Sequence, residues 1–524
     1  MRRRSSSSGL PSDEMLAAPS PSIYKGGKSV SDGLLSPYLV GDERHTQIVV
    51  EQRQTRRFFL LSGIGVAVLL VSIGVLVYFI LHIEAKSSSA SFTSSSTFNP
   101  NEESLCDDVQ QDAGYIALPH KKNAYAFYWF FASRREPSQD PLIVWIDGGP
   151  GCSSLWSMLA ENGPCSVEKD LSTTSNPFSW NKEANVLWLD QPTFTGYSVG
   201  TKEDYDDETD DVSVNIHAFL VGFFERHPEL RRNALFLAGE GYAGHYLLAA
   251  TLYIQTQNTR VDSSLQIQVK GLALGNPLIV PSVQHDHTLD MLDNSYNISL
   301  ASNEEARAAQ IRLSTCLDLI QECKSSVGAC VDATIYCQKH VGGVLRTAGR
   351  NPFDIRKECN QTAAADCYDS SAITSFLNSE RVQTYLGIQT AVTPTWKHCN
   401  LQVAMDFAYS GDFMRDYDSY MTQLLTNTDV RVLVYAGDAD IVCNWSGNYA
   451  WTKSLDWPHH DEYNAASEVT FRTLDGKEAG MVRTYANQLT FMRVFESGYR
   501  VPMDQPQVAL EMMTRFMNSQ SIAG

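Results

Sequence analysis

Residues 237–246 read LAGEGYAGHY, and this segment carries the most information about the fold. It joins the end of a short apolar run, residues 234–238, to a tight Gly-Glu-Gly turn and a helix-forming stretch, residues 242–252. This strand–turn–helix order is that of a nucleophile elbow, in which a strained turn displays a serine above a parallel sheet. The central position of this turn is Gly241, which has no side chain. The pattern therefore predicts the framework of a serine hydrolase that lacks its attacking atom.

Apolar runs of strand length recur along the chain. They lie at residues 125–132, 141–146, 184–189, 234–238, 269–274 and 430–436. Runs without polar alternation are typical of strands that are buried on both faces of a mostly parallel sheet. Helix-like stretches such as residues 210–226 and 242–255 alternate with these runs, which favours an α/β fold.

One region interrupts this alternation, from about residue 281 to 378. It holds six of the cysteines and two glycosylation sequons, and it has no strong strand runs. We interpret it as a disulfide-rich cap that is inserted over the carboxyl edge of the sheet.

The N-terminal part of the chain differs in composition from the rest. Residues 1–57 are rich in Ser, Pro, Gly and charge, which predicts a disordered tail. Residues 58–81 carry no charge, and a helix of this length, at about 1.5 Å per residue, crosses a hydrocarbon core of roughly 30 Å. We predict a transmembrane helix there, a flexible Ser-rich linker at 82–104 and a globular domain at 105–520.

Two alternatives fit the apolar span less well. A cleaved signal peptide would begin nearer the N-terminus and have a shorter apolar core. A helix buried in a protein core would show a polar face. The flanking charges give the orientation, because Arg53, Arg56 and Arg57 precede the span while Glu84 and Lys86 follow it. The excess of positive charge predicts a cytosolic N-terminus.

Cysteines and sequons predict that the domain after the span is luminal or extracellular. All 11 cysteines lie between Cys106 and Cys443, where an oxidising compartment would let them pair. Asn297 and Asn360 begin glycosylation sequons, and Asn444 begins a third by pattern. The expected location is therefore the secretory pathway, a vacuole or lysosome, or the cell surface.

The charge balance argues against some partners. After residue 81 the chain carries 32 of its 41 Lys and Arg residues and 54 of its 60 Asp and Glu residues, a balance of −22. A domain this acidic is a poor candidate for binding nucleic acid or anionic lipid surfaces. We expect no nucleic-acid partner, and membrane contact only through the integral span.

Five motifs stand in order along the domain. They are WIDGGPGCSS from Trp145, DQPTFTGYSV from Asp190, GEGYAGHY from Gly239, YAGDADIVCNWSG from Tyr435 and GYRVP from Gly498. The chain resembles the serine carboxypeptidases of the yeast vacuolar and lysosomal type, which have WLNGGPGCSS, DQPxGxGFSY, GESYAGHY, YAGDxDxICNWLG and GHMVP. The resemblance covers roughly residues 105–520 and implies an α/β-hydrolase fold with a mostly parallel central sheet.

The departures from this family fall on the reacting groups. The serine position is Gly241, the histidine position is Tyr499, and the acid, Asp440, is retained. The triad needs a hydroxyl that attacks and an imidazole that takes its proton. Glycine supplies no nucleophile, and tyrosine, with a reference pKa of about 10, cannot relay protons near neutral pH. Glycine also adopts the strained angles of the turn with little penalty, so the fold is kept.

The resemblance assigns further roles around the triad. It places the oxyanion hole at Gly149 and Tyr242. It places recognition of a peptide's terminal carboxylate at Asp147, Gly148, Glu161 and Glu240. Because Asp147 replaces an asparagine, three carboxyl groups stand where a carboxylate should bind. We expect at least one raised pKa among them and weakened binding of C-terminal carboxylates near neutral pH.

Other nucleophilic or basic residues do not replace the lost groups. His245 belongs to the GHY that active relatives also carry, so we interpret it as structural. Ser153 and Ser154 belong to the glycine turn, and Cys443 is expected to be a buried free thiol. No cofactor and no metal site is expected, because disulfides explain the cysteine spacings better than metal ligands do.

The resemblance also implies the pairing of the cysteines. The pairs are Cys152–Cys399, Cys316–Cys337, Cys323–Cys330 and Cys359–Cys367, which leaves Cys106–Cys165 as a fifth pair and Cys443 free.

These observations lead to an interpretation as a pseudoenzyme: a single-pass membrane protein whose carboxypeptidase-like domain binds or scaffolds a peptide or protein ligand. The alternative is an active serine-type carboxypeptidase, or a related hydrolase or acyltransferase, with a non-standard site. A homodimer and a pairing with an active homologue remain open as partners.

Overall fold

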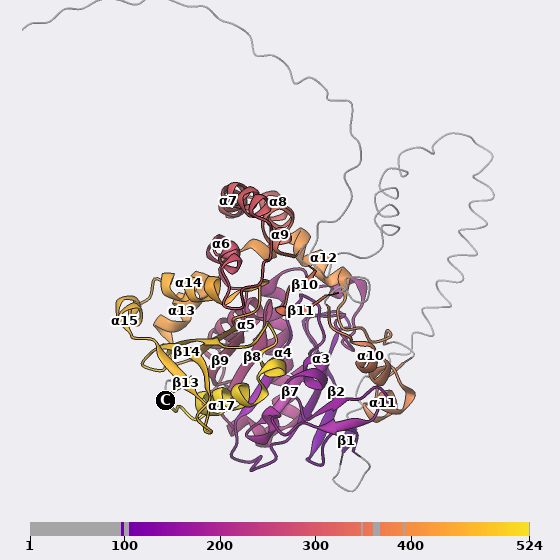
Figure 1. Cartoon of the computed structure of the whole chain (residues 1–524). Helices are drawn as coiled ribbons and strands as arrows, with labels where there is room; N and C mark the ends of the chain where they lie inside the picture. Colours follow the sequence, from indigo (N-terminus) through magenta and orange to yellow (C-terminus); the bar gives the residue numbers. More distant parts are fainter. Residues whose placement is uncertain (1–95, 99–103, 347–348, 360–366, 391–392, 523–524) are drawn as a thin grey trace, which may run out of the picture. The chain divides into compact units, whose positions relative to one another are not determined.

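A computed structural model describes residues 96–98, 104–346, 349–359, 367–390 and 393–522 of the chain (Figure 1). The predicted tail, residues 1–57, and the predicted transmembrane helix, residues 58–81, lie outside the described residues. Within the described ranges, no helix combines the length and the apolar character that a membrane span requires.

Eleven strands form one sheet in the order β1-β2-β3-β7-β4-β8-β9-β12-β15-β14-β13. Their bounds are β1 Ser96–Phe98, β2 Gln111–Ala117, β3 Tyr125–Phe131, β4 Leu142–Ile146, β7 Asn185–Leu189, β8 Leu235–Glu240, β9 Val269–Gly275, β12 Arg431–Gly437, β13 Val469–Arg472, β14 Glu478–Tyr485 and β15 Leu489–Val494. The central strands from β7 to β15 pair in parallel, and the strands at both edges pair antiparallel. The sheet is that of an α/β-hydrolase.

The strand β1 lies within the predicted linker at residues 82–104 and pairs antiparallel with β2. Part of the predicted linker is therefore an edge strand. Backbone pairing at the edge of a sheet does not require the apolar run by which the central strands were recognised.

Helices cover both faces of the sheet because the central strands are apolar on both sides. Leu142, Val144 and Ile146 of β4 pack into one hydrophobic cluster, which includes residues of α4 (Thr209–Arg226) and α5 (Ala243–Asn258). The alternate residues of the same strand, Ile143 and Trp145, pack into a second cluster with residues of α3 (Ser154–Ala160) and α17 (Pro506–Met517). The continuous apolar run of β4 therefore contributes to two cores.

The segment between β9 and β12 is mainly helical. Its helices are α6 Pro281–Asp286, α7 Asn303–Cys323, α8 Val327–Cys337, α9 Gly343–Leu345, α10 Ser371–Leu377, α11 Glu380–Tyr385, α12 Leu401–Ser410 and α13 Asp418–Asn427. It also holds a small hairpin of β10 (Arg350–Asn351) and β11 (Asp354–Glu358). Residues of α7 and α8 form a third hydrophobic cluster with Ala439 and Ile441, which follow the carboxyl end of β12. This insertion therefore lies at the carboxyl edge of the sheet.

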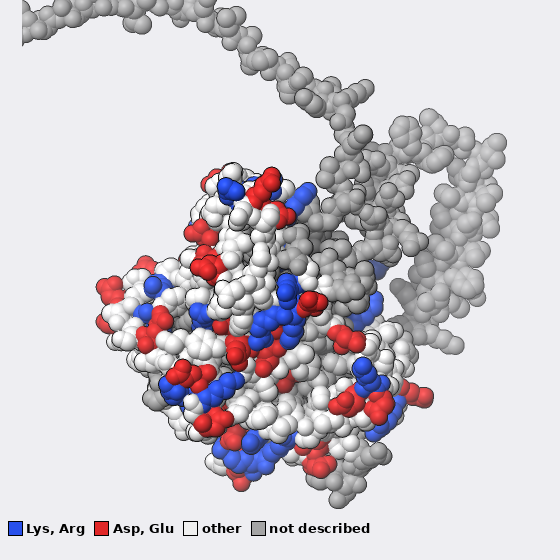
Figure 2. Space-filling model, viewed as in Figure 1, with Lys and Arg blue, Asp and Glu red and all other residues white. Residues whose placement is uncertain are grey.

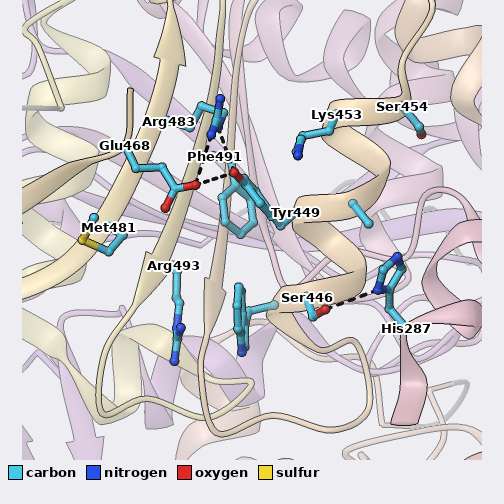
Figure 3. A pocket seen from close by; sticks show the side chains of 12 residues that line it. His287, Ser446, Tyr449, Lys453, Ser454, Glu468, Met481, Arg483, Phe491 and Arg493 are labelled. Carbon is cyan, nitrogen blue, oxygen red and sulfur yellow. Dashed lines mark hydrogen bonds and ion pairs between the residues drawn. The ribbon is translucent and has the colours of Figure 1, made fainter. Parts of the chain in front are cut away.

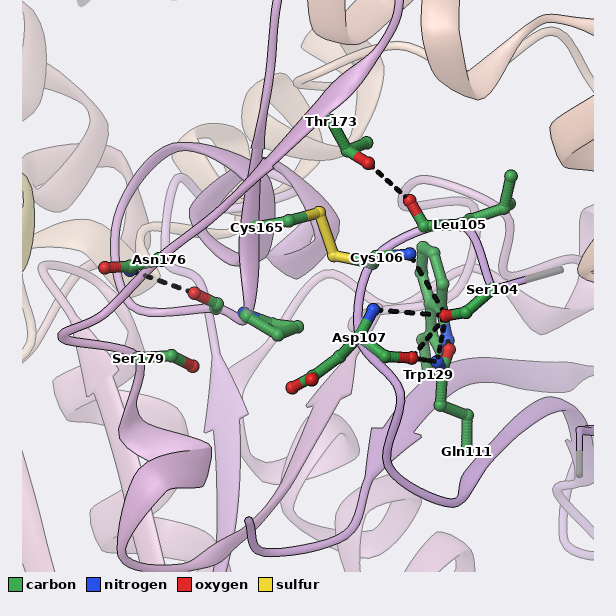
Figure 4. Close-up of a disulfide and its surroundings, with 12 residues drawn as sticks. Ser104, Leu105, Cys106, Asp107, Gln111, Trp129, Cys165, Thr173, Asn176 and Ser179 are labelled. Atoms are coloured by element: carbon green, nitrogen blue, oxygen red, sulfur yellow. Dashed lines mark hydrogen bonds between the residues drawn. A yellow bond between two sulfur atoms is a disulfide. The ribbon is translucent and has the colours of Figure 1, made fainter. Parts of the chain in front are cut away.

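Five disulfides hold the domain together: the four pairs that the resemblance implies and the pair of remaining cysteines, Cys106–Cys165. They are Cys106–Cys165, Cys152–Cys399, Cys316–Cys337, Cys323–Cys330 and Cys359–Cys367, and Cys443 is free. Figure 4 shows Cys106–Cys165, which ties the start of the domain to β5 (Cys165–Val167) beside a hydrogen bond from Thr173 Oγ1 to the Leu105 carbonyl.

Candidate active site

The turn between β8 and α5 has the geometry of a nucleophile elbow. Gly241 has φ +57°, in the left-handed region that favours glycine. Its N–H donates to the carbonyl of Gly275 at 2.9 Å, and its carbonyl accepts from the N–H of Leu278 at 2.9 Å. The end of β9 and the chain that follows it therefore hold the turn from both sides.

The side chain of Tyr499 occupies the space in front of Gly241. A Cβ atom built on Gly241 would lie 2.0 Å from Tyr499 Oη and 3.0 Å from Tyr499 Cζ. Both distances are far below van der Waals contact for carbon, so a side chain at position 241 and the tyrosine in this position exclude each other. The two positions that lost the triad groups are therefore in direct contact.

Packing fixes the Tyr499 ring in this position. The ring meets Phe353 edge-on, with centroids 5.3 Å apart and an interplanar angle of 71°. The Tyr499 N–H donates to the carbonyl of Phe353 at 2.7 Å, and the residue is buried. Aromatic edge contacts of this kind stabilise a single ring orientation.

The retained acid, Asp440, is fully buried in the loop after β12. Its oxygens accept hydrogen bonds from the N–H groups of Val442 at 2.9 Å and Cys443 at 3.0 Å, and from Asn276 Nδ2 at 2.9 Å. Burial raises the pKa of Asp440 to about 7, although these hydrogen bonds act in the opposite direction. Asn276 is a supporting residue that the sequence motifs did not reveal.

The glycine turn after β4 lies against the elbow. A Cβ atom on Gly148 would be 2.6 Å from both the Tyr242 nitrogen and the Glu240 carbonyl oxygen. Only glycine allows this approach of two backbone segments. Gly149, the next residue, has φ +111°. The residues that the resemblance assigns to the oxyanion hole, Gly149 and Tyr242, therefore belong to two adjoining turns.

Three buried carboxyl groups lie together beside these turns. Asp147 follows β4, Glu161 caps the end of α3, and Glu240 ends β8. Ser157 Oγ joins the first two, at 2.8 and 2.7 Å from the Asp147 carboxyl oxygens and 3.0 Å from Glu161 Oε1. Neither Glu240 carboxyl oxygen has a hydrogen-bond partner within the part of the chain that the structure describes.

A buried arginine supplies the positive charge of this cluster. Arg500 Nη1 forms an ion pair with Glu161 Oε1 and lies 3.9 Å from Glu240 Oε2. The guanidinium carbon stands 3.9 Å from the centroid of the Trp156 ring, a cation–π contact. The side chain of Arg500 is only 4% exposed, so its charge acts at low effective dielectric.

The carboxyl groups hold protons more tightly than exposed ones do. Burial raises the pKa of Glu161 to about 7, with Arg500 acting against that rise. Burial likewise raises the pKa of Asp147 and raises that of Glu240 well above its usual range, the latter with the added effect of the neighbouring carboxylates. The direction agrees with the expectation for three carboxyl groups at one place.

Comparison with known proteins assigns the domain to a protein family. The serine carboxypeptidase family model matches residues 100–519. Carboxypeptidase Y homolog A from Botryotinia fuckeliana is 36% identical over 421 residues, which cover 79% of this chain and 74% of the relative. The homologue from Ajellomyces capsulatus is 37% identical over 422 residues, with the same two coverages, 79% and 74%. The chain belongs to the serine carboxypeptidase family.

A solved structure shares the fold of this serine carboxypeptidase family member. It is Kex1(Δ)p, a prohormone-processing carboxypeptidase from Saccharomyces cerevisiae, with a TM-score of 0.69 and 23% identity. The match covers 80% of this chain and 92% of that chain.

Arg500 is the charged site residue that sequence reasoning missed. It stands in GYRVP where the family's GHMVP has methionine, directly after the position of the lost histidine. A signal was present, since a new arginine in one motif accompanies a new aspartate, Asp147, in another. Reading it required knowing that the two motifs meet in space.

The other nucleophilic or basic candidates, His245, Ser153, Ser154 and Cys443, are not arranged as a nucleophile with its base. His245 is buried, with its Nδ1 3.8 Å from Asp412 Oδ2 and its ring against Tyr417. Ser153 Oγ donates to Asp190 Oδ1 at 2.6 Å, and Ser154 Oγ donates to the Leu189 carbonyl at 2.6 Å. Cys443 is free as expected, but it is only partly buried rather than fully buried. Desolvation still raises the pKa of its thiol, which keeps it protonated and a poor nucleophile.

Among the described residues, two groups of His and Cys side chains lie close enough to suggest metal ligands. They are Cys152, His398 and Cys399, and His285, Cys316 and Cys337. The cysteines of each group are joined in a disulfide, so they offer no thiolate to a metal ion.

The sequons differ in their accessibility. Asn297 is exposed, whereas Asn360 lies outside the described residues. Asn444 is buried at the start of α14 (Trp445–Ser454), where Oδ1 accepts from the Gly447 N–H at 2.7 Å and Nδ2 donates to the His287 carbonyl at 3.0 Å. The folded domain has no room for a glycan on Asn444.

Proposed function

We propose that this serine carboxypeptidase family member does not hydrolyse peptides and acts as a ligand-binding or scaffolding pseudoenzyme. The observation that carries the proposal is the contact between Gly241 and Tyr499, in which a phenol occupies the space of the nucleophile's side chain. Acylation needs a hydroxyl that attacks and a base that takes its proton. In serine proteases, loss of the serine or the histidine alone lowers turnover by roughly a factor of 10⁶.

The carboxylate-recognition end supports the same proposal. An incoming C-terminal carboxylate would add negative charge beside Asp147, Glu161 and Glu240, where Arg500 is already paired with Glu161. Above about pH 7, where Glu161 is ionised, this arrangement disfavours a free acid and favours a ligand whose terminus is neutral. We expect an amidated peptide to bind at least as tightly as the same peptide with a free C-terminus. The usual family preference for the free acid would contradict this expectation.

A fluorophosphonate probe tests the loss of catalysis, because it labels only an activated serine. The full chain is compared with Gly241→Ser/Tyr499→His, which returns both missing groups and removes the ring that excludes them. We expect labelling of the double variant alone. Gly241→Ser with Tyr499 retained is the matched control, and we expect it to stay unlabelled. Labelling of the unmodified chain would falsify the proposal in favour of an active hydrolase with a non-standard site.

We also propose that the domain is displayed on the luminal or extracellular side of a membrane by the apolar span at residues 58–81. Five disulfides support an oxidising compartment. Extraction with alkaline carbonate tests the anchor, since an integral protein stays in the membrane pellet and a luminal one is released. Co-purification of differently tagged copies then distinguishes a homodimer from pairing with an active homologue.

A further inference from the structure

One cavity of the domain lies apart from the candidate active site. Its volume is about 590 Å³, in the range of small-molecule sites, and α14, β14 and β15 form its walls (Figure 3). Three aromatic side chains, Trp445, Tyr449 and Phe491, make up much of the lining. None of the residues that line it belongs to the triad positions or to the carboxyl cluster.

Two of the charged residues in the cavity, Arg483 and Glu468, form an ion pair with each other. Arg483 donates to the carbonyls of Asn464 at 2.6 Å and Ala466 at 2.7 Å, and to Glu468 Oε1 at 3.1 Å. Glu468 also accepts from the Tyr449 hydroxyl. Figure 3 shows this network at one end of the cavity. It fixes the Tyr449 ring and leaves little charge of either sign for a ligand.

The remaining charge of the cavity is positive. Lys453 extends from α14 toward Tyr449 (Figure 3), with Nζ 5.2 Å from the ring centroid. It makes no ion pair with a described residue, although its charge also acts on Glu468. The Arg493 guanidinium stacks on Trp445 at 4.0 Å. Its Nε is buried and has no hydrogen-bond partner in the described part of the chain, while the side chain as a whole remains 23% exposed. Its one ion pair with a described residue is long, 3.4 Å from Nη2 to Asp438 Oδ2.

This positive site is unusual for so acidic a domain. The chain carries a net charge of −19, and Figure 2 shows acidic and basic side chains interspersed over the visible face. Lys453 and Arg493 beside an aromatic lining therefore match one kind of ligand, in which an oxyanion is attached to a flat or apolar body. We propose that this cavity binds a small organic anion with an aromatic body, either a carboxylate or a phosphate monoester.

Calorimetry on the full chain tests the proposal with three probes: phenylpropionate, phenyl phosphate and the neutral phenylpropanol. We expect at least one anion to bind at least about tenfold more tightly than the alcohol, as one charge-assisted hydrogen bond implies. The tighter of the two anions identifies the acid group that the site prefers. The affinity should also fall as salt is added, because the site is open to solvent.

Three variants assign the effect to the cavity. Lys453→Gln should weaken binding of the anion about tenfold, whereas Lys453→Arg, which keeps the charge, should stay within about threefold of the unmodified chain. Lys270→Gln is the matched control, since Lys270 is an exposed lysine on β9 outside the cavity, and it should bind like the unmodified chain. The proposal is overturned if neither anion binds, if the alcohol binds as tightly, or if Lys453→Gln has no effect. Binding in this cavity does not depend on the proposed loss of catalysis, because the three probes do not measure hydrolysis.

Discussion

At the scale of single residues, Gly241 and Tyr499 form one structural unit. The tyrosine ring fills the space that any side chain at position 241 would need, with only 2.0 Å from the built Cβ to Oη. Loss of the serine and loss of the histidine are therefore physically linked. Arg500 and Asp147 form a second linked pair. Asp147 adds a third carboxyl group to the cluster, and the positive charge of Arg500 offsets the negative charge of these groups.

The first link predicts a non-additive change in stability. Gly241→Ala should lower the free energy of unfolding by about 1–3 kcal/mol through overpacking against Tyr499. The same change in a Tyr499→Ala background should cost only about 1 kcal/mol, the residual penalty of a left-handed backbone for a residue other than glycine. Urea unfolding of the four proteins measures the coupling. An equal cost in both backgrounds would show that the ring does not occupy this space.

The second link predicts a pH-dependent loss of stability. Arg500→Met removes the buried partner of Glu161 and should cost about 3–5 kcal/mol near neutral pH, as for other broken buried pairs. The cost should shrink toward pH 5, where the carboxyl groups take up protons and need no counter-charge. Glu161→Gln should restore part of the loss. Arg472→Met, in an exposed ion pair, should change stability by less than about 0.5 kcal/mol.

At the scale of elements, the start of α14 shows how local structure decides whether a motif can act. Asn444 matches a sequon, yet its side chain is the N-cap of this helix and is buried. Asn297 lies in an exposed turn. The same three-residue pattern therefore has a different meaning in each place.

This difference predicts opposite results for two substitutions in a secreting eukaryotic cell. Asn297→Gln should remove one glycan, seen as a faster band on a gel, and the difference from the unmodified chain should vanish when both are deglycosylated enzymatically. Asn444→Gln should leave the glycan content unchanged and lower the free energy of unfolding by about 1 kcal/mol, because the helix loses its cap. A loss of one glycan in Asn444→Gln would contradict the buried position of this side chain.

At the scale of the whole molecule, buried acids set the response to pH. Burial raises the pKa of Glu161, Asp190 and Asp440 to about 7. Between pH 4 and pH 7 the folded chain therefore binds more protons than the unfolded chain, and stability falls as pH rises through this window. Asp412 acts in the opposite direction, because its pKa is lowered to about 2 and its contribution is lost only as pH falls below about 4.

Because stability falls as pH rises through this window, the melting temperature should depend on pH. The full chain should melt at a higher temperature near pH 5 than near pH 8, by several degrees, when followed by differential scanning fluorimetry. Glu161→Gln should reduce this difference, since glutamine cannot bind the extra proton. A melting temperature that rises from pH 5 to pH 8 in the unmodified chain would show that these acids ionise freely.

Particular elements show what the sequence could predict. The strands β4, β7 and β12 lie within one or two residues of the apolar runs at 141–146, 184–189 and 430–436, because burial on both faces leaves an unmistakable run. The outer strands β13 and β14 were missed, since both are partly exposed and their sequences mix polar and apolar residues. Arg500 was missed because its partner Glu161 is 339 positions away.

The amino-acid sequence by itself determined the family, the α/β-hydrolase fold, and the replacement of the serine and histidine positions by Gly241 and Tyr499. These follow from local motifs in order, which chain neighbours are sufficient to define. The three-dimensional structure was needed to find that Tyr499 fills the space before Gly241 and that Arg500 lies among three carboxyl groups. Both facts depend on contacts between distant segments, and sheet packing brings such segments together in a way that no local pattern records.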